Sequence, residues 1–172
     1  IIFMAPEIIR LLGSKSYWDA IYSVIPIVAG GYFAFLYTIP SSVEYYHGKT
    51  QYIAGGTGLA AIINIVLNYI FIRQYGYIAA AYTTLATYFL YFLFHYIIAA
   101  KIEGKTIFSN GTMIGCAIGI AVSVVLGNVL IEHTVMRMLI ILSLFLISLA
   151  HEEKNIGTRL NSSHSAKSRM PS

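Results

Sequence analysis

Residues 77–100 read YIAAAYTTLATYFLYFLFHYIIAA and contain no Lys, Arg, Asp or Glu. A helix needs about 20 mostly apolar residues to cross the roughly 30 Å hydrocarbon core of a bilayer, so this stretch is long enough. Strands of a membrane barrel instead alternate apolar and polar residues over about 10 positions. No such alternation occurs here, and the stretch therefore predicts a membrane-spanning helix.

Four further stretches have the same apolar character, which extends the prediction to the whole chain. Of its 172 residues 58% are hydrophobic and 10% are charged, whereas soluble domains carry about 25% charged residues. So few charges leave too little polar surface to face water. We predict an all-α, polytopic transmembrane bundle lying in a lipid bilayer, with spans at about residues 17–45, 52–72, 77–100, 112–131 and 135–150.

The last fifteen residues differ abruptly from the rest. Residues 158–172 read TRLNSSHSAKSRMPS, and both flanks resemble the in-frame translation of a DNA sequencing adapter. We expect a non-native tail here and a transmembrane domain over residues 1–157, with a native polar tail as the alternative. Of the 11 Lys and Arg, three lie in this tail, leaving 8 against 7 acidic residues. The basic charge therefore does not indicate nucleic-acid binding. Because the chain starts with Ile1 in an apolar stretch, we expect a piece of a longer protein.

The sequence offers little material for catalysis. Cys116 is the sole cysteine, which excludes a disulfide framework and argues against a structural metal site. Neither clustered His and carboxylate residues nor a phosphate-cradling glycine loop is present. We expect no enzymatic activity, no cofactor and no metal.

Two asparagines interrupt the second predicted span. Asn64 and Asn68 are four residues apart and share one helix face. Amides in hydrocarbon need hydrogen-bonding partners. They are therefore either structural contacts between helices or cavity-lining groups that bind sugar hydroxyls.

A polar stripe runs along the third predicted span. Thr84, Tyr88, Tyr91 and His95 follow one another at intervals of four, three and four. An ionisable side chain within a span is a functional candidate, and tyrosine offers sugars both a ring and a hydroxyl. The alternative is that the stripe is satisfied by neighbouring spans, with His95 neutral.

Polar residues also lie at span ends. Tyr37, Ser41 and Glu44 share one face of the first span, where Glu44 is either a group for ion or substrate binding or part of a solvated helix end. Arg73 ends the second span. It either anchors the helix at the headgroups or contacts a pyrophosphate.

The fourth span carries a small residue at every fourth position. These residues are Gly111, Gly115, Gly119, Ser123 and Gly127. Such a face lets another helix approach closely. We expect its partner to be the fifth span or a helix outside this chain.

Several stretches resemble bacterial oligosaccharide flippases of the Wzx type, in the multidrug/oligosaccharidyl-lipid/polysaccharide exporter superfamily. They are FMAPEIIRLLG at 3–13, YWDA at 17–20, NIVLNYIFI at 64–72 and YGYIAAAYTT at 75–84. The resemblance covers residues 1–101 and implies a two-lobed transporter with a central cavity and alternating access. This chain would form the C-terminal part of the second lobe.

The resemblance also implies a function and a location. The substrate would be an undecaprenyl-linked oligosaccharide, such as an O-antigen, capsule or exopolysaccharide unit, in the bacterial inner membrane. Polysaccharide polymerase and chain-length proteins are further candidate partners. A drug or other-lipid exporter of the same superfamily is the main alternative, and a membrane enzyme of polysaccharide assembly is another.

Overall fold

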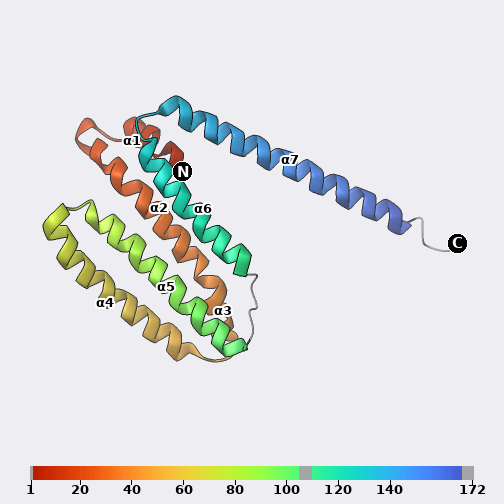
Figure 1. The fold of residues 1–172 in the computed structure, drawn as a ribbon, viewed down its shortest axis with the longest axis horizontal. Coiled ribbons are helices and arrows are strands. Elements are labelled where there is room, and N and C mark those ends of the chain that lie inside the picture. Colours follow the sequence, from red (N-terminus) through yellow and green to blue (C-terminus); the bar gives the residue numbers. More distant parts are fainter. Residues whose placement is uncertain (1, 105–109, 168–172) are drawn as a thin grey trace. The chain divides into compact units, whose positions relative to one another are not determined.

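A computed structural model describes the backbone of residues 2–104 and 110–167, and the side chains of residues 2–104, 111–152 and 156. Every regular element in these ranges is helical (Figure 1). The elements are the 3₁₀ helices η1 (Ile2–Met4) and η2 (Lys15–Ala20) and the α-helices α1 (Ala5–Leu12), α2 (Ile21–Leu36), α3 (Thr38–Tyr46), α4 (Thr50–Tyr75), α5 (Ala79–Glu103), α6 (Asn110–Val129) and α7 (Thr134–Lys167).

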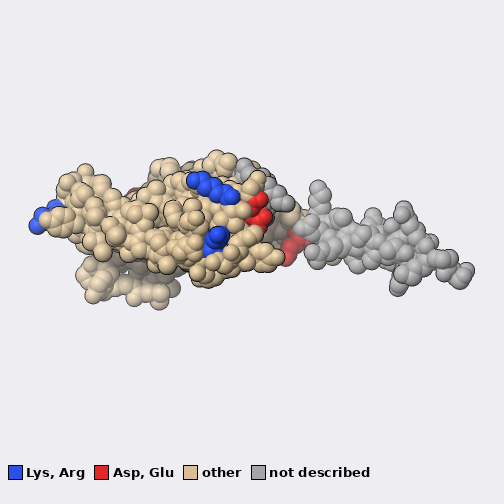
Figure 2. All heavy atoms as spheres, turned by 90° about the horizontal axis from the view of Figure 1, so that it is seen from below, with Lys and Arg blue, Asp and Glu red and all other residues tan. Residues whose placement is uncertain are grey.

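The predicted all-α fold with five spans is confirmed. Five segments of the described chain are long and apolar enough to cross a membrane: Lys15–Tyr46, Thr50–Tyr75, Ala79–Glu103, Gly111–Val129 and Thr134–Glu152. Figure 2 shows one face of the molecule, on which uncharged residues cover most of the described surface. Helices of this length suit lipid because their backbone groups are all bonded internally.

The first span consists of more than one helix. It begins as η2, continues as α2 without interruption through Pro26, and breaks at Tyr37 before α3 starts. Pro40 explains the break, because it has no N–H to donate to the carbonyl four residues earlier. Pro26 lies inside α2 without interrupting it, so the break occurs only near the second proline of the span.

Helix α5 is the centre of the compact unit Ile1–Ile131. It lies between α2 and α4, and α3 contacts its C-terminal half (Figure 1). Phe33 and Leu36 of α2 pack with Phe92 of α5 and Met113 of α6 to form one apolar cluster. This packing fixes the register between α2, α3 and α5, on which the polar contacts below depend.

The chain's second compact unit is Glu132–Ser172, which contains α7. The predicted non-native segment 158–172 falls here. The backbone of α7 extends into it as far as Lys167, whereas its side chains lie outside the described residues. Its origin stays a prediction.

The small-residue face of α6 has a close contact at one end. A Cβ at Gly127 would lie 2.7 Å from Ile2 Cγ2, whereas Gly115 and Gly119 have nothing within 4 Å. Gly111 is exposed, and the Ser123 hydroxyl donates to the carbonyl of Gly119 over 2.8 Å. Within its unit α6 packs against α2 and η1. Which helix covers the rest of this face stays a prediction.

Candidate functional site

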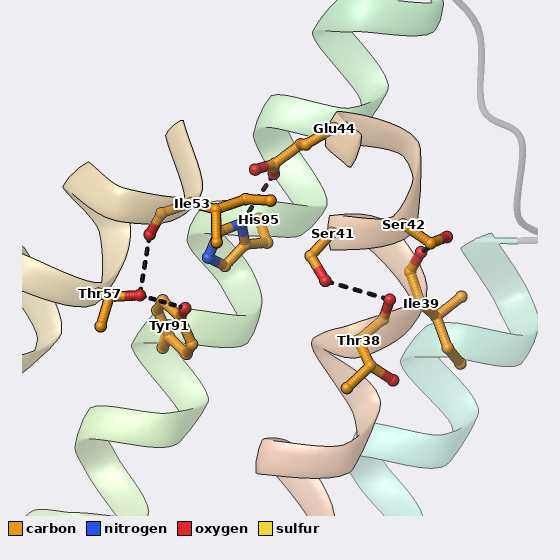
Figure 3. Close-up of polar contacts among 9 residues, drawn as sticks. All are labelled: Thr38, Ile39, Ser41, Ser42, Glu44, Ile53, Thr57, Tyr91 and His95. Carbon is orange, nitrogen blue, oxygen red and sulfur yellow. Dashed lines mark hydrogen bonds and ion pairs between the residues drawn. The ribbon is translucent and has the colours of Figure 1, made fainter. Parts of the chain in front are cut away.

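Polar groups inside the spans form two neighbouring sites along α5 (Figure 3). One is a buried ion pair between α3 and α5. The other is a polar pocket between α4 and α5. Tyr91 belongs to both sites, because its ring lies beside the ion pair and its hydroxyl lines the pocket.

The ion pair joins Glu44 of α3 to His95 of α5. His95 Nδ1 and Glu44 Oε1 are 2.7 Å apart, and both side chains are 0% exposed. The remaining polar atoms, Glu44 Oε2 and His95 Nε2, are buried without a hydrogen-bond partner among the described residues. Burying ionisable groups costs several kcal/mol per ion unless charge and hydrogen bonding are satisfied. This pair leaves part of its hydrogen-bonding capacity unused.

Aromatic rings surround the imidazole of His95. The ring of Tyr91 lies edge-on to it at 4.5 Å between centroids, and that of Phe94 at 5.2 Å. Tyr37, at the break between α2 and α3, lies 5.6 Å from His95 and 4.5 Å from Tyr91. These rings exclude water from the ion pair.

The sequence-based interpretation of Glu44 as a solvated helix end is wrong. Glu44 lies near the end of α3, but this end packs on α5 and α4. The histidine that reaches the solvated boundary is His47, whose Nε2 is 2.9 Å from Glu103 Oε1 in an exposed pair. Two His–Glu pairs, one buried and one exposed, therefore join α3 and the turn after it to α5.

The polar pocket occupies about 280 Å³ between α4 and α5. Its walls combine hydroxyl, amide, aromatic and methyl groups. They come from Thr57, Ala60, Ala61, Asn64, Thr84, Thr87, Tyr88 and Tyr91. At one end the hydroxyls of Thr57 and Tyr91 are hydrogen-bonded at 2.8 Å, and Thr57 also donates to the carbonyl of Ile53 (Figure 3).

A row of side-chain hydrogen bonds continues from the pocket along the two helices. Asn64 Nδ2 donates to Thr87 Oγ1 over 3.3 Å, and Asn68 Nδ2 donates to Asn64 Oδ1 over 2.9 Å. Thr83 in turn donates to Asn68 Oδ1. The asparagines thus join α4 to α5, and Asn64 also faces the pocket. The two alternatives for Asn64 are compatible.

The structure brings together some predicted residues and separates others. Of the predicted stripe, Thr84, Tyr88 and Tyr91 line the pocket with Asn64, whereas His95 pairs with Glu44 instead. The Ser41 hydroxyl bonds to the carbonyl of Thr38 within α3.

Arg73 lies apart from both sites. It is exposed at the C-terminal end of α4. Its Nη1 donates to the hydroxyl of Tyr69 over 3.0 Å, and its guanidinium stacks on the same ring at 4.6 Å. This placement at a helix end suits anchoring at the headgroups.

Three threonines of the site were missed from the sequence. Thr57, Thr83 and Thr87 each bond to a side chain of the facing helix. A lone threonine in a span gives little signal, because its hydroxyl can bond to its own backbone. The available signal was the alignment of Thr57 with Asn64, seven residues apart on one helix face.

Among the described side chains, no group of three or more His, Cys, Asp or Glu could hold a metal ion. The site is therefore interpreted as a set of hydrogen-bonding and ionisable groups within membrane-spanning helices.

Comparison of the chain with protein-family models, with curated proteins and with solved structures gives no match.

Proposed function

We propose that this protein is a membrane transporter that moves a lipid-linked oligosaccharide across the bacterial inner membrane. The observation that carries the proposal is the polar pocket inside the span region, lined by Thr57, Asn64, Thr84, Tyr88 and Tyr91. Its hydroxyls and amide both donate and accept, and its tyrosine rings offer faces for sugar C–H groups. A few hydroxyl and amide groups set in a mostly apolar wall suit a neutral ligand that has both hydroxyl groups and C–H faces.

The resemblance of residues 1–101 to Wzx-type flippases supports the same function. In that superfamily two lobes rock around a central cavity. A pocket between neighbouring helices of one lobe would then supply part of the sugar-binding surface. Lipid II flippases and drug exporters share versions of these sequence stretches. The resemblance therefore supports a transporter of this superfamily, and the pocket lining supports a sugar as the group that it carries.

A second candidate is a transporter of apolar drugs or other lipids on the same scaffold. A larger pocket of about 610 Å³ near the other end of α4 and α5 favours it. Its lining is largely apolar and aromatic: Leu67, Phe71, Tyr75, Ile78, Ala79, Tyr82, Thr83 and Ala86. An isoprenoid or acyl chain also suits this pocket, which is compatible with a lipid-linked sugar.

Reconstitution in proteoliposomes tests the choice between them. An undecaprenyl-linked oligosaccharide is placed in one leaflet, and its arrival in the other is followed with a lectin. Tyr88→Phe removes a pocket hydroxyl and should slow the transfer several-fold, whereas Tyr22→Phe, on an exposed tyrosine outside the pocket, should not. Efflux of ethidium without transfer of the sugar lipid would favour the drug exporter.

A further inference from the structure

We propose that the Glu44–His95 pair is a proton-binding site whose occupancy controls whether α3 stays packed on α5. Four structural features support this: the burial of the pair, its charge, the break before α3 and the contact between His95 and Tyr91. The inference rests on the proposed function only in taking the neighbouring pocket as the substrate site. The proton site itself requires no substrate.

Charge balance inside the bundle favours a pair with no net charge. Both side chains are 0% exposed, and each is the other's ion-pair partner among the described residues. The net charge of the pair as a whole changes by one unit when one proton is added or removed. A protonated imidazole beside a carboxylate has no net charge, and neither has a neutral imidazole beside a carboxylic acid. Adding one proton to either form gives an imidazolium beside a neutral carboxylic acid, with a net charge of +1.

Among the side chains that the structure describes, no other ionic group is paired with Glu44 or His95 to offset that charge. The titratable groups facing His95 are Tyr37 at the α2–α3 break, Glu44 of α3 and Tyr91 of α5. Helix α4 presents Gly56, which does not titrate. Tyr45 of α3 lies within electrostatic range of Tyr91. The charged groups that follow along the chain, His47, Lys49 and Glu103, are at the solvent boundary.

An unbalanced buried charge is unfavourable, and water can reduce that penalty only by reaching the pair. With Glu44 neutral, the imidazolium has lost its counter-ion and keeps only a hydrogen bond to the carboxyl oxygen. Protonation therefore favours separation of α3 from α5 and entry of water. The two unpartnered atoms, Glu44 Oε2 and His95 Nε2, provide positions for that water to bind.

The chain before α3 is built to allow this movement. α2 ends at Leu36, and Pro40 in the first turn of α3 lacks an N–H. The hydroxyls of Thr38, Ser41 and Ser42 bond to backbone carbonyls three residues earlier. Such bonds bend helices. The break at Tyr37 can therefore act as a hinge for α3.

Tyr91 connects the proton site to the polar pocket. Its ring lies 4.5 Å from both His95 and Tyr37, and its hydroxyl is hydrogen-bonded to Thr57 at the end of the pocket. Figure 3 shows Tyr91 beside His95 and pointing to Thr57. Movement of α3 away from α5 separates Glu44 from His95 and lets the adjoining rings of His95 and Tyr91 shift, which changes the end of the pocket.

Distance measurement between spin labels tests the movement. Cys116→Ala removes the native thiol, and Tyr46→Cys on α3 with Tyr77→Cys before α5 places labels on exposed positions. Helix α5 has 25 residues and so is about 37 Å long at about 1.5 Å per residue, which suits double electron–electron resonance. The full chain is measured in phosphatidylethanolamine/phosphatidylglycerol nanodiscs, without substrate.

With the pair intact, lowering the pH from about 8 to about 4, which spans the ordinary titration ranges of histidine and glutamate side chains, should add a second distance shifted by about 5 Å, one helical turn. Glu44→Gln and His95→Gln should abolish this pH dependence. His47→Gln removes the exposed pair and should leave it unchanged. No shift in the unmodified pair, persistence of the shift in His95→Gln, or its loss in His47→Gln would each overturn the proposal.

The double variant Glu44→Gln/His95→Gln covers the case in which a single variant fails to reconstitute. Two amides can hydrogen-bond to each other without charge, and the expected result is one pH-independent distance. A pH-dependent distance in this variant also overturns the proposal.

Pocket accessibility tests the connection through Tyr91. The rate of maleimide labelling of Thr84→Cys is divided by the rate for Tyr69→Cys, a position outside the pocket. The pH dependence of thiol reactivity cancels in this ratio. This ratio should change several-fold with pH when the pair is intact and stay constant in Glu44→Gln. A constant ratio in both overturns the connection. Neither experiment contains a sugar lipid, so failure of the oligosaccharide assay alone would contradict the proposed function and leave the proton site standing.

Discussion

Gly56 of α4 faces the ring of His95 on α5 so closely that a Cβ at position 56 would lie 3.1 Å from His95 Nε2. The same Cβ would lie 2.8 Å from Phe94 Cε1. Gly56 is also the buried residue of α4. The absence of a side chain here lets α4 cover the buried ion pair.

Gly56→Ala should therefore destabilise the protein, although alanine favours helices by about 1 kcal/mol over glycine. The added methyl forces Phe94 to move, and overpacking of this kind typically costs about 1–3 kcal/mol. Gly55→Ala is the matched control, because a Cβ there has nothing within 4 Å. Unfolding in SDS, followed by circular dichroism, should rank Gly55→Ala as the more stable variant. Equal stability would mean that the approach of α4 is not tight.

The membrane-spanning helices were predictable from the sequence, because the residues of each span alone decide that it is helical. Residues 77–100 have no charged side chain other than a histidine, and lipid requires such a run to be helical. The break at Tyr37 was harder to locate, because Pro40 signals a disturbed helix without fixing the residue at which it stops.

Removing one member of the Glu44–His95 pair should have asymmetric effects. His95→Gln leaves a buried carboxylate without its cationic partner, and breaking a buried pair in this way costs about 3–5 kcal/mol. Glu44→Gln leaves an imidazole, which can be buried as a neutral group. We expect the second cost to be nearer the 1–3 kcal/mol typical of a buried group that loses a hydrogen-bond partner, about half the first.

A double-mutant cycle in SDS measures both costs and their coupling. The double variant Glu44→Gln/His95→Gln should be more stable than the sum of the single changes predicts. Additive changes would show that the two side chains do not interact in the bilayer.

The exposed pair of His47 and Glu103 should contribute much less. Their side chains are 35% and 26% exposed, and ion pairs open to solvent contribute about 0–1 kcal/mol. Glu103→Gln should lower the free energy of unfolding by less than about 1 kcal/mol. The difference should shrink further in about 1 M salt, which screens charges over about 3 Å. A salt-independent loss would indicate that Glu103 acts by packing.

Asn68 should matter more to stability than its exposed neighbours on α4. Asn68→Ala removes the bond to Asn64 and the acceptor of Thr83. Side-chain hydrogen bonds between membrane helices contribute about 0.6 kcal/mol each on average and up to about 1.7. The expected loss is about 1–2 kcal/mol by the same scale. Gln74→Ala, at an exposed position of the same helix, should cause little change.

The candidate site was predictable where its residues lie on one helix, and it was not predictable where they come from different helices. Spacing within one helix correctly grouped Thr84, Tyr88 and Tyr91, because residues three and four apart share a face. Glu44 and His95 are 51 residues apart, and their contact depends on how α3 and α5 pack. A position near the end of a helix does not reveal whether that end meets solvent, which is why the sequence left two alternatives open for Glu44.

The small-residue face of α6 should tolerate alanine at one end and not at the other. A Cβ at Gly127 would lie 2.7 Å from Ile2 Cγ2 and 3.4 Å from Ile25 Cδ1, inside an apolar cluster, so Gly127→Ala forces η1 or α2 to shift. The expected loss is about 1–3 kcal/mol, less the gain in helix propensity. Gly119→Ala meets nothing within 4 Å and gains only that propensity, so it should stabilise the helix. The comparison is made by SDS unfolding of both variants in the same detergent. If Gly119→Ala were instead the more harmful change, the small-residue face would be covered by a helix outside the described contacts, as the sequence pattern predicted.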